Sequence, residues 1–268
     1  MTYQGHQSMP VALTIAGLDP SGGAGVIADL RAFASLGCFP TAAITSVTFQ
    51  NATRVFGAEH LAAKTVRAQV LAIVDGHKVA CAKTGMLPTR EVVREVARLF
   101  RETNLPAPIV DPVVNSTSGY ALISENALED LQKELLPLAR LVTPNIPEAE
   151  RITGLSIDDE EGMRRAAQAM REMGARAVLV KGGHLREQEA EGGRPEAGGQ
   201  RQAIDYLDNE GRVTVLREEW IAGGSIRGTG CMLSAAIAAC LGKGMSLEGA
   251  VRDAKKFVTE AIRTAQRI

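Results

Sequence analysis

The chain has 268 residues, of which 45% are hydrophobic, and a formal net charge of −1, so neither a nucleic acid nor a membrane surface is expected as a partner. Its four cysteines lack the CxxC spacing of a zinc site, which fits a cytoplasmic protein, and no apolar stretch reaches the roughly 20 residues of a membrane helix. These properties favour one α/β domain that binds small molecules.

Short apolar strands alternate with longer helical patterns, which is typical of a mostly parallel sheet with helices on both faces. We expect a disordered tail over residues 1–10, followed by a single domain over residues 11–268. Strands are predicted at residues 11–16, 41–49, 79–82, 109–110, 141–143 and 177–180. Helices are predicted at residues 24–36, 61–75, 89–103, 124–135, 147–153, 159–173, 229–241 and 246–266.

Residues 184–202 interrupt this pattern, because they are charged and rich in glycine with almost no apolar side chains. Such a segment cannot bury enough surface to offset its ordering entropy, so we expect it to be mobile. It is either a solvated excursion between two strands or a flap over a bound nucleotide, since it directly follows the loop VKGG.

The first glycine-rich loop, AGLDPSGGAG at residues 16–25, follows a predicted strand and leads into a helix. The glycine spacing at residues 23–28 matches a dinucleotide fingerprint, but the next strand lacks the acidic residue that would bind the ribose. We therefore interpret the loop, with Gly17, as a cradle for a small substrate. Asp29, one helical turn further, either binds a ring nitrogen or is an exposed helix carboxylate.

Two further strand ends carry residues suited to a flat heteroaromatic ring. Gln50 and Asn51 follow the second predicted strand, and an amide reads both donor and acceptor edges of a ring. For Asn51 a turn cap is an equally good interpretation. In the block KTGM, Met86 either covers a ring or belongs to the core.

Polar residues after the later strands are suited to a metal and a nucleotide. Asp111 and Glu148 are the carboxylates best placed to hold Mg²⁺, and Asn145 lies one helical turn before Glu148. The same NIPE sequence is typical of a helix start with Asn145 as its cap, and both interpretations are compatible. Lys181 and Gly182 in VLVKGGH are suited to nucleotide phosphate or ribose.

The tetrapeptide GTGC at residues 228–231 precedes a small, apolar run that predicts a buried helix. The first N–H groups of a helix have no intrahelical partners and hold anions well. The predicted anion site therefore consists of Gly228, Thr229, Gly230 and Cys231. A thiol at a helix N-terminus is expected to have a lowered pKa, so Cys231 is a candidate proton acceptor or nucleophile.

Between residues 12 and 262 the chain carries, in order, the blocks LTIAGLDPSGGAG, QN, KTGML, DPV, LVTPNIPEAE, VLVKGGH and GTGCMLSAAIAA. In this order they resemble the hydroxymethylpyrimidine and hydroxymethylpyrimidine phosphate kinases of thiamine biosynthesis, members of the ribokinase-like superfamily. The resemblance implies a three-layer α/β fold, ATP with Mg²⁺, two successive phosphorylations of the pyrimidine, and a homodimer. It also implies that Gln50 and Met86 contact the pyrimidine, that residues 228–230 form an anion hole, and that Cys231 replaces the aspartate base of many sugar kinases.

The sequence departs from this family pattern at several positions, among them Arg227, often histidine, and Thr117, where a number of relatives have lysine. Pyridoxal kinases of the same superfamily share GTGC and are the nearest alternative, although Gln50 favours a pyrimidine. A pyrimidine-sensing module without catalytic activity is the alternative of a different class.

Overall fold

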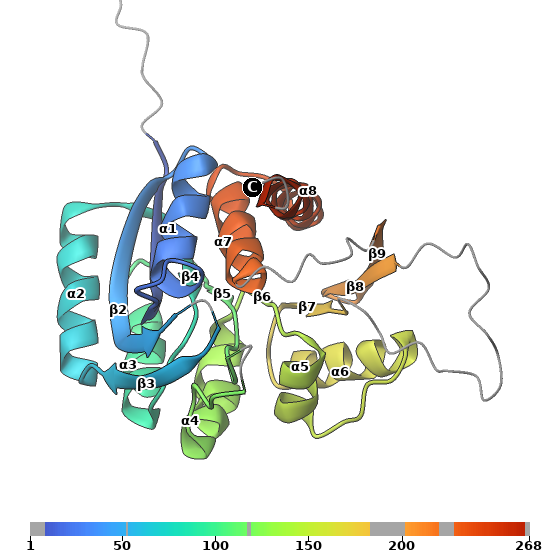
Figure 1. The fold of residues 1–268 in the computed structure, drawn as a ribbon, viewed down its shortest axis with the longest axis horizontal. Coiled ribbons are helices and arrows are strands. Elements are labelled where there is room, and N and C mark those ends of the chain that lie inside the picture. Colours follow the sequence, from blue (N-terminus) through green and yellow to red (C-terminus); the bar gives the residue numbers. More distant parts are fainter. Residues whose placement is uncertain (1–8, 52, 117–118, 183–201, 220–227, 266–268) are drawn as a thin grey trace, which may run out of the picture.

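The computed structural model describes residues 9–51, 53–116, 119–182, 202–219 and 228–265, whose strands form one sheet (Figure 1). The strand order is β3-β2-β1-β4-β5-β6-β7-β8-β9. The strands are β1 (Val11–Leu18), β2 (Phe39–Gln50), β3 (Val55–His60), β4 (Val79–Thr84), β5 (Ile109–Val110), β6 (Leu141–Val142), β7 (Ala177–Lys181), β8 (Gln202–Asn209) and β9 (Arg212–Glu219). From β2 to β7 all neighbours are parallel, and only the pairs at the two edges are antiparallel.

Helices cover both faces of the sheet, which confirms the predicted three-layer α/β architecture (Figure 1). One face carries α1 (Gly25–Ser35), α7 (Thr229–Gly242) and α8 (Leu247–Ala265). The other face carries α2 (Ala63–Gly76), α3 (Arg90–Glu102), α4 (Glu125–Asp130), α5 (Ile146–Thr153) and α6 (Glu160–Glu172). None of the described helices has the length and apolar character required to cross a membrane.

Alternate residues of the central strands β5, β6 and β7 belong to different cores. In β7, Ala177 and Leu179 pack with the helices α7 and α8, whereas Val178 and Val180 pack with the cluster on the opposite face. Successive side chains of a strand point to opposite faces, so a strand covered on both faces is apolar throughout. The buried strands thus hold their carboxyl ends, and the loops that follow them, in fixed positions.

The sequence did not predict the edge strands β3, β8 and β9. These strands are antiparallel and partly exposed, and β8 has buried acidic residues, so they lack the continuous apolar run that marks the central strands. The predicted helix at 124–135 is α-helical only to Asp130 and continues as a π-helical turn, Leu131–Leu135.

Parts of the predicted tail and flap lie outside the described residues. Of the tail, Met9 and Pro10 are described, and the Pro10 carbonyl accepts a hydrogen bond from Phe39 N at 2.8 Å. Of residues 184–202, only Gln202 at the start of β8 is described. The division into a disordered tail, one domain and a mobile flap stays a prediction.

Candidate active site

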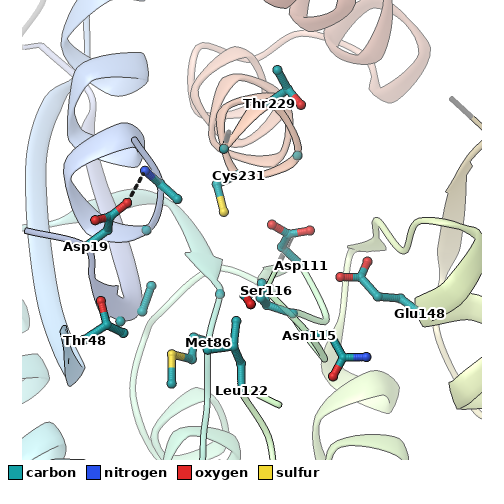
Figure 2. A pocket seen from close by; sticks show the side chains of 18 of the residues that line it. Asp19, Thr48, Met86, Asp111, Asn115, Ser116, Leu122, Glu148, Thr229 and Cys231 are labelled. Carbon is teal, nitrogen blue, oxygen red and sulfur yellow. Dashed lines mark hydrogen bonds between the residues drawn. The ribbon is translucent and has the colours of Figure 1, made fainter. Parts of the chain in front are cut away.

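A cavity of about 290 Å³ lies at the carboxyl ends of the parallel strands, beside the first turn of α7 (Figure 2). It brings together most of the residues that the sequence singles out: Gly17, Gln50, Met86, Asp111, Asn145, Glu148, Lys181, Gly228, Thr229, Gly230 and Cys231. They come from segments far apart in the chain because parallel strands present all their carboxyl ends at one edge of a sheet.

On one side of the cavity, two glycine turns meet backbone to backbone. Gly228, the N-cap of α7, has a φ of +79°, and a Cβ on it would clash with the carbonyl oxygen of Gly23. Gly25 begins α1 with a φ of +57°, where a Cβ would clash with the carbonyl oxygen of Gly17. Only glycine permits this conformation and this approach at both positions. The loop before α1 and the start of α7 are therefore fixed to each other.

Asp19 shapes the first of these turns, and sequence reasoning missed it. Its Oδ1 accepts hydrogen bonds from the backbone N (2.8 Å) and Oγ (2.6 Å) of Ser21, and its Oδ2 accepts one from Ala24 N at 3.0 Å (Figure 2). An aspartate that bonds the backbone two residues further on is typical of a tight turn. The sequence signal was the aspartate directly before PSGG.

The first turn of α7 presents backbone N–H groups to the cavity. Its first intrahelical bond runs from Met232 N to Gly228 O at 2.8 Å, so the N–H groups of residues 229–231 precede the helical hydrogen-bond pattern. Lys181 Nζ lies beside Gly230, since a Cβ atom added to this glycine would lie 3.1 Å from it. The helix start, with its partial positive charge, and this ammonium group together favour an anion at this end of the cavity.

Asp111 is a buried carboxylate at the centre of a charged network. Its Oδ1 accepts hydrogen bonds from Lys181 Nζ at 3.0 Å and from Thr143 Oγ1 at 3.3 Å, and its Oδ2 accepts one from Ser234 Oγ at 3.3 Å. Burial alone would raise the pKa of Asp111, but the charges of Lys181 and Lys83 outweigh it and keep that pKa below its usual value. Asp111 is therefore ionised.

Asn145 and Glu148 form a capping box at the start of α5, as predicted by the interpretation of Asn145 as a helix cap. Asn145 Oδ1 accepts from Glu148 N, and Glu148 Oε2 accepts from Asn145 N, both at 2.8 Å. Burial, together with the negative charge of Asp111, raises the pKa of Glu148 to about 7. The two carboxylates thus lie in one cavity and disfavour each other's ionisation.

Cys231 points its sulfur into the cavity (Figure 2). The backbone N–H of Gly25 acts to lower the pKa of this thiol, so the start of α1 influences it as well as the start of α7. Burial nevertheless raises the pKa of Cys231 to about 12, although Lys83 acts against this shift. The expectation of a lowered pKa is therefore wrong, because the loss of hydration outweighs the helix start.

The end of the cavity away from α7 combines apolar and amide side chains. Met86 is only 6% exposed, and a Cβ on Gly17 would lie 2.9 Å from its sulfur, so Met86 lies against the first glycine loop. Leu122 lies beside Met86 (Figure 2), and Gln50 and Asn115 also line the cavity and add amide groups. Apolar walls with a few amides are suited to a flat, polar-edged ring.

A family model described as phosphomethylpyrimidine kinase matches residues 19–268. The chain belongs to this family. A relative from Streptomyces coelicolor, named hydroxymethylpyrimidine/phosphomethylpyrimidine kinase, is 43% identical over 253 residues, which cover 94% of this chain and 88% of the relative. The family expected from the order of the motif blocks is confirmed.

Solved structures of vitamin kinases resemble this chain over nearly its whole length. The crystal structure of phosphomethylpyrimidine kinase from Clostridium difficile has a TM-score of 0.79 at 37% identity and covers 95% of this chain and 100% of its own. Pyridoxal kinase from Staphylococcus aureus, in complex with AMP-PCP and pyridoxal, has a TM-score of 0.81 at 29% identity. The match covers 95% of this chain and 88% of the pyridoxal kinase chain. The ribokinase-like fold is thus confirmed.

Two predicted site residues of this kinase do not line the cavity. Asp29 is neither exposed nor open to a ligand, because it is fully buried and paired with Lys83. Gly182 donates its N–H to Asp205 Oδ1 at 3.0 Å, and a Cβ there would clash with the carbonyl oxygen of Ile204, so this glycine faces β8. Both predictions are wrong because neighbouring elements use these groups.

Sequence reasoning also left Lys83 of the block KTGM without a role, although it lines the cavity of this kinase. The only signal was a lysine inside an otherwise apolar strand, which indicates a buried partner of opposite charge. The departures at Thr117 and Arg227 lie outside the described residues.

Proposed function

We propose that this kinase transfers the terminal phosphoryl group of ATP to hydroxymethylpyrimidine, and then phosphorylates the monophosphate to the diphosphate. One observation carries the proposal: a single cavity is lined both by apolar and amide side chains, among them Met86 and Gln50, and by the start of α7. The names of the relatives support the pyrimidine, and the AMP-PCP in the related pyridoxal kinase supports ATP. The homodimer and the cytoplasmic location stay predictions.

The start of α7 is suited to hold the phosphoryl group during transfer. Phosphoryl transfer needs alignment and neutralisation of charge more than it needs covalent chemistry. The N–H groups of residues 229–231 supply fixed donors, and Lys181 supplies a point charge beside Gly230. Because Gly228 fixes α7 to the loop before α1, these donors do not need to reorganise when charge develops.

Asp111 and Glu148 fit a divalent cation. Both are buried, and burial raises the pKa of Glu148, so a bound cation would favour its ionised form. Magnesium in phosphoryl-transfer sites uses one or two carboxylates, waters and substrate phosphates, and when bound it neutralises phosphate charge. Asn145 Oδ1 is already used by the helix cap, so its role is to position Glu148.

Cys231 is suited to accept the hydroxymethyl proton in the first step. Its sulfur lies between the donors of α7 and the ring end of the cavity. In the second step the nucleophile is a phosphate anion and needs little help from a base. Cys231→Ser is therefore expected to slow alcohol phosphorylation much more than phosphate phosphorylation in single-turnover assays. Equal slowing of both steps would contradict the role as base.

The proposed substrate is tested by measuring ADP formation with hydroxymethylpyrimidine, its monophosphate, pyridoxal, pyridoxine and ribose. We expect the two pyrimidines to give the highest kcat/KM. Higher values for pyridoxal would favour the second candidate, a pyridoxal kinase, which the similarity to the Staphylococcus aureus enzyme supports and in which Cys231 would add to the aldehyde. No ADP formation with any of these compounds would favour a sensing module.

A further inference from the structure

Thr45 is a buried threonine of β2 that contacts a residue of the cavity lining. Its Oγ1 donates a hydrogen bond to the backbone carbonyl oxygen of Met86 at 2.7 Å, and its own carbonyl accepts one from Leu61 N at 2.9 Å. Thr45 is 0% exposed and is not among the described residues that line the cavity, whereas Met86 is. The hydroxyl of Thr45 therefore acts on the cavity only through Met86.

A register shift in the sheet sets Thr45 apart from the other residues of β2. On β1, Ala16 pairs with Ile44. The next residue of β1, Gly17, pairs with Ser46, so Thr45 is skipped in the pairing of these two strands. An extra residue of this kind redirects side chains and is frequent beside active sites. The shift lies opposite Gly17, which itself lines the cavity.

Met86 is held at its side chain as well as at its backbone. A Cβ on Gly17 would lie 2.9 Å from the sulfur and 3.4 Å from the Cβ of Met86, so the thioether packs on the bare backbone of β1. A methionine side chain is unbranched and flexible, so its position depends on what holds the residue. The Thr45 hydroxyl and the Gly17 backbone together fix the surface that Met86 presents to the cavity (Figure 2).

We propose that Thr45 is a positioning residue for the pyrimidine ring, whose hydroxyl holds Met86 where the thioether contacts the ring. The inference rests on the proposed function, in which Met86 contacts the pyrimidine. A thioether sulfur makes favourable contacts with an aromatic ring, and such contacts depend on close approach. The ring itself is unchanged by phosphoryl transfer, so this contact stabilises the ground state and the transition state alike. Its loss raises KM and leaves kcat unchanged.

Thr45→Val tests the hydroxyl, because valine has nearly the same shape and cannot donate a hydrogen bond. We expect KM for hydroxymethylpyrimidine to rise by at least about fivefold, with kcat within about twofold of the wild type. Calorimetric titration with the pyrimidine in the absence of ATP should show the same rise in Kd. Thr45→Ser keeps the donor and should return KM to within about twofold of the wild-type value. An unchanged KM in Thr45→Val, or no rescue by serine, would overturn the proposal.

The position of Met86 is measured directly by NMR of the protein without substrate, with isotopic labels in the methionine methyl groups. The chain has eight methionines, and Met86→Leu assigns the signal of Met86. Thr45→Val should shift or broaden this signal, and Thr45→Ser should restore it. A Met86 signal at its wild-type position in Thr45→Val would overturn the proposal.

Thr41 offers a matched control in the same strand. Its Oγ1 donates to the carbonyl oxygen of Ala12 at 2.9 Å, and neither residue is among the described residues that line the cavity. Thr41→Val also removes a hydrogen bond from threonine to a backbone carbonyl, and it should leave KM and the Met86 signal unchanged. If this control changed both as much as Thr45→Val does, the cause would be general loosening of β2, and the role of Thr45 would be refuted.

Thr45→Ala replaces Thr45→Val if the valine variant does not fold, with the same changes in KM and in the Met86 signal expected. The NMR measurement needs no substrate, so the two proposals fail separately. A wild type that does not phosphorylate hydroxymethylpyrimidine overturns the proposed function. An active wild type whose KM and Met86 signal are insensitive to loss of the Thr45 hydroxyl overturns only the role of Thr45.

Discussion

The two sides of the cavity are built in different ways. On one side, Gly228 brings the start of α7 into direct backbone contact with Gly23 in the loop before α1, and Gly25 packs that loop against Gly17. On the other side, Asp111, Glu148 and Lys181 meet through charged side chains. Side chains can adjust by rotation and protonation, whereas a backbone contact cannot. Substitutions should therefore abolish function on the glycine side and change it by degrees, with pH and cations, on the charged side.

Gly228→Ala is expected to have the largest effect. The new Cβ would clash with the carbonyl oxygen of Gly23, so α7 must move away from the first loop, and its donors would lose their alignment. Because loss of one aligned donor already costs about 100- to 1000-fold, we expect both phosphorylation steps to fall by at least about 1000-fold in single-turnover assays.

Gly244→Ala is the matched control for that variant. Gly244 has a φ of +86°, but nothing lies within 4 Å of its Cβ position, so alanine there has the backbone strain without the clash. This control should lose stability and keep its activity. Activity of Gly228→Ala near that of the wild type would show that the glycine contact does not align the donors.

Asp111→Asn tests the charged side and should have the next largest effect. The substitution preserves shape but removes the counter-charge of Lys181 and one of the two carboxylates that fit magnesium. We expect kcat to fall by about 100-fold and the magnesium concentration for half-maximal rate to rise. Steady-state rates over a magnesium titration measure both.

Asp130→Asn separates loss of stability from loss of function in that experiment. Asp130 is only 3% exposed and accepts from Arg90 Nε at 2.9 Å, yet it does not line the cavity. The Asp130→Asn variant should have a lower melting temperature than the wild type and the same dependence of rate on magnesium concentration. A change of the same size in both variants would contradict the assignment of Asp111.

Glu148→Gln should have the smallest effect and should appear in stability. The pKa of Glu148 rises from 4.5 to about 7, so the folded state retains a proton that the unfolded state has lost. The stability that this group contributes is complete below pH 4.5 and is lost as the pH rises to about 7. Without magnesium, the free energy of unfolding of the variant should therefore rise by about 3 kcal/mol relative to that of the wild type as the pH increases from 4.5 to about 7.

Urea unfolding of both proteins at pH 5 and pH 8 measures that difference. Asp111, whose ionisation is linked to that of Glu148, has a lowered pKa and is ionised at both pH values, so its titration does not contribute. Parallel pH profiles would contradict the raised pKa. Magnesium, by holding the ionised carboxylate, should reduce the difference at the higher pH.

The strands β1, β4, β5, β6 and β7 and the helices that follow them were predictable, because apolar runs and helical periods are local properties of a sequence. Glycine turns and polar residues directly after those strands then marked the cavity. The edge strands β3, β8 and β9 were not predicted, because their pairing partners and partial exposure are properties of the assembled sheet.

The sequence by itself determined the family, the parallel α/β architecture and the edge of the sheet at which the site lies. Only the tertiary structure decided that Asp29 faces Lys83 instead of a substrate, and that Gly182 faces β8. It also decided the direction in which the pKa values of Cys231 and Glu148 shift. The physical reason is that burial and the nearest charge depend on elements far apart in the chain, which no local pattern of residues records.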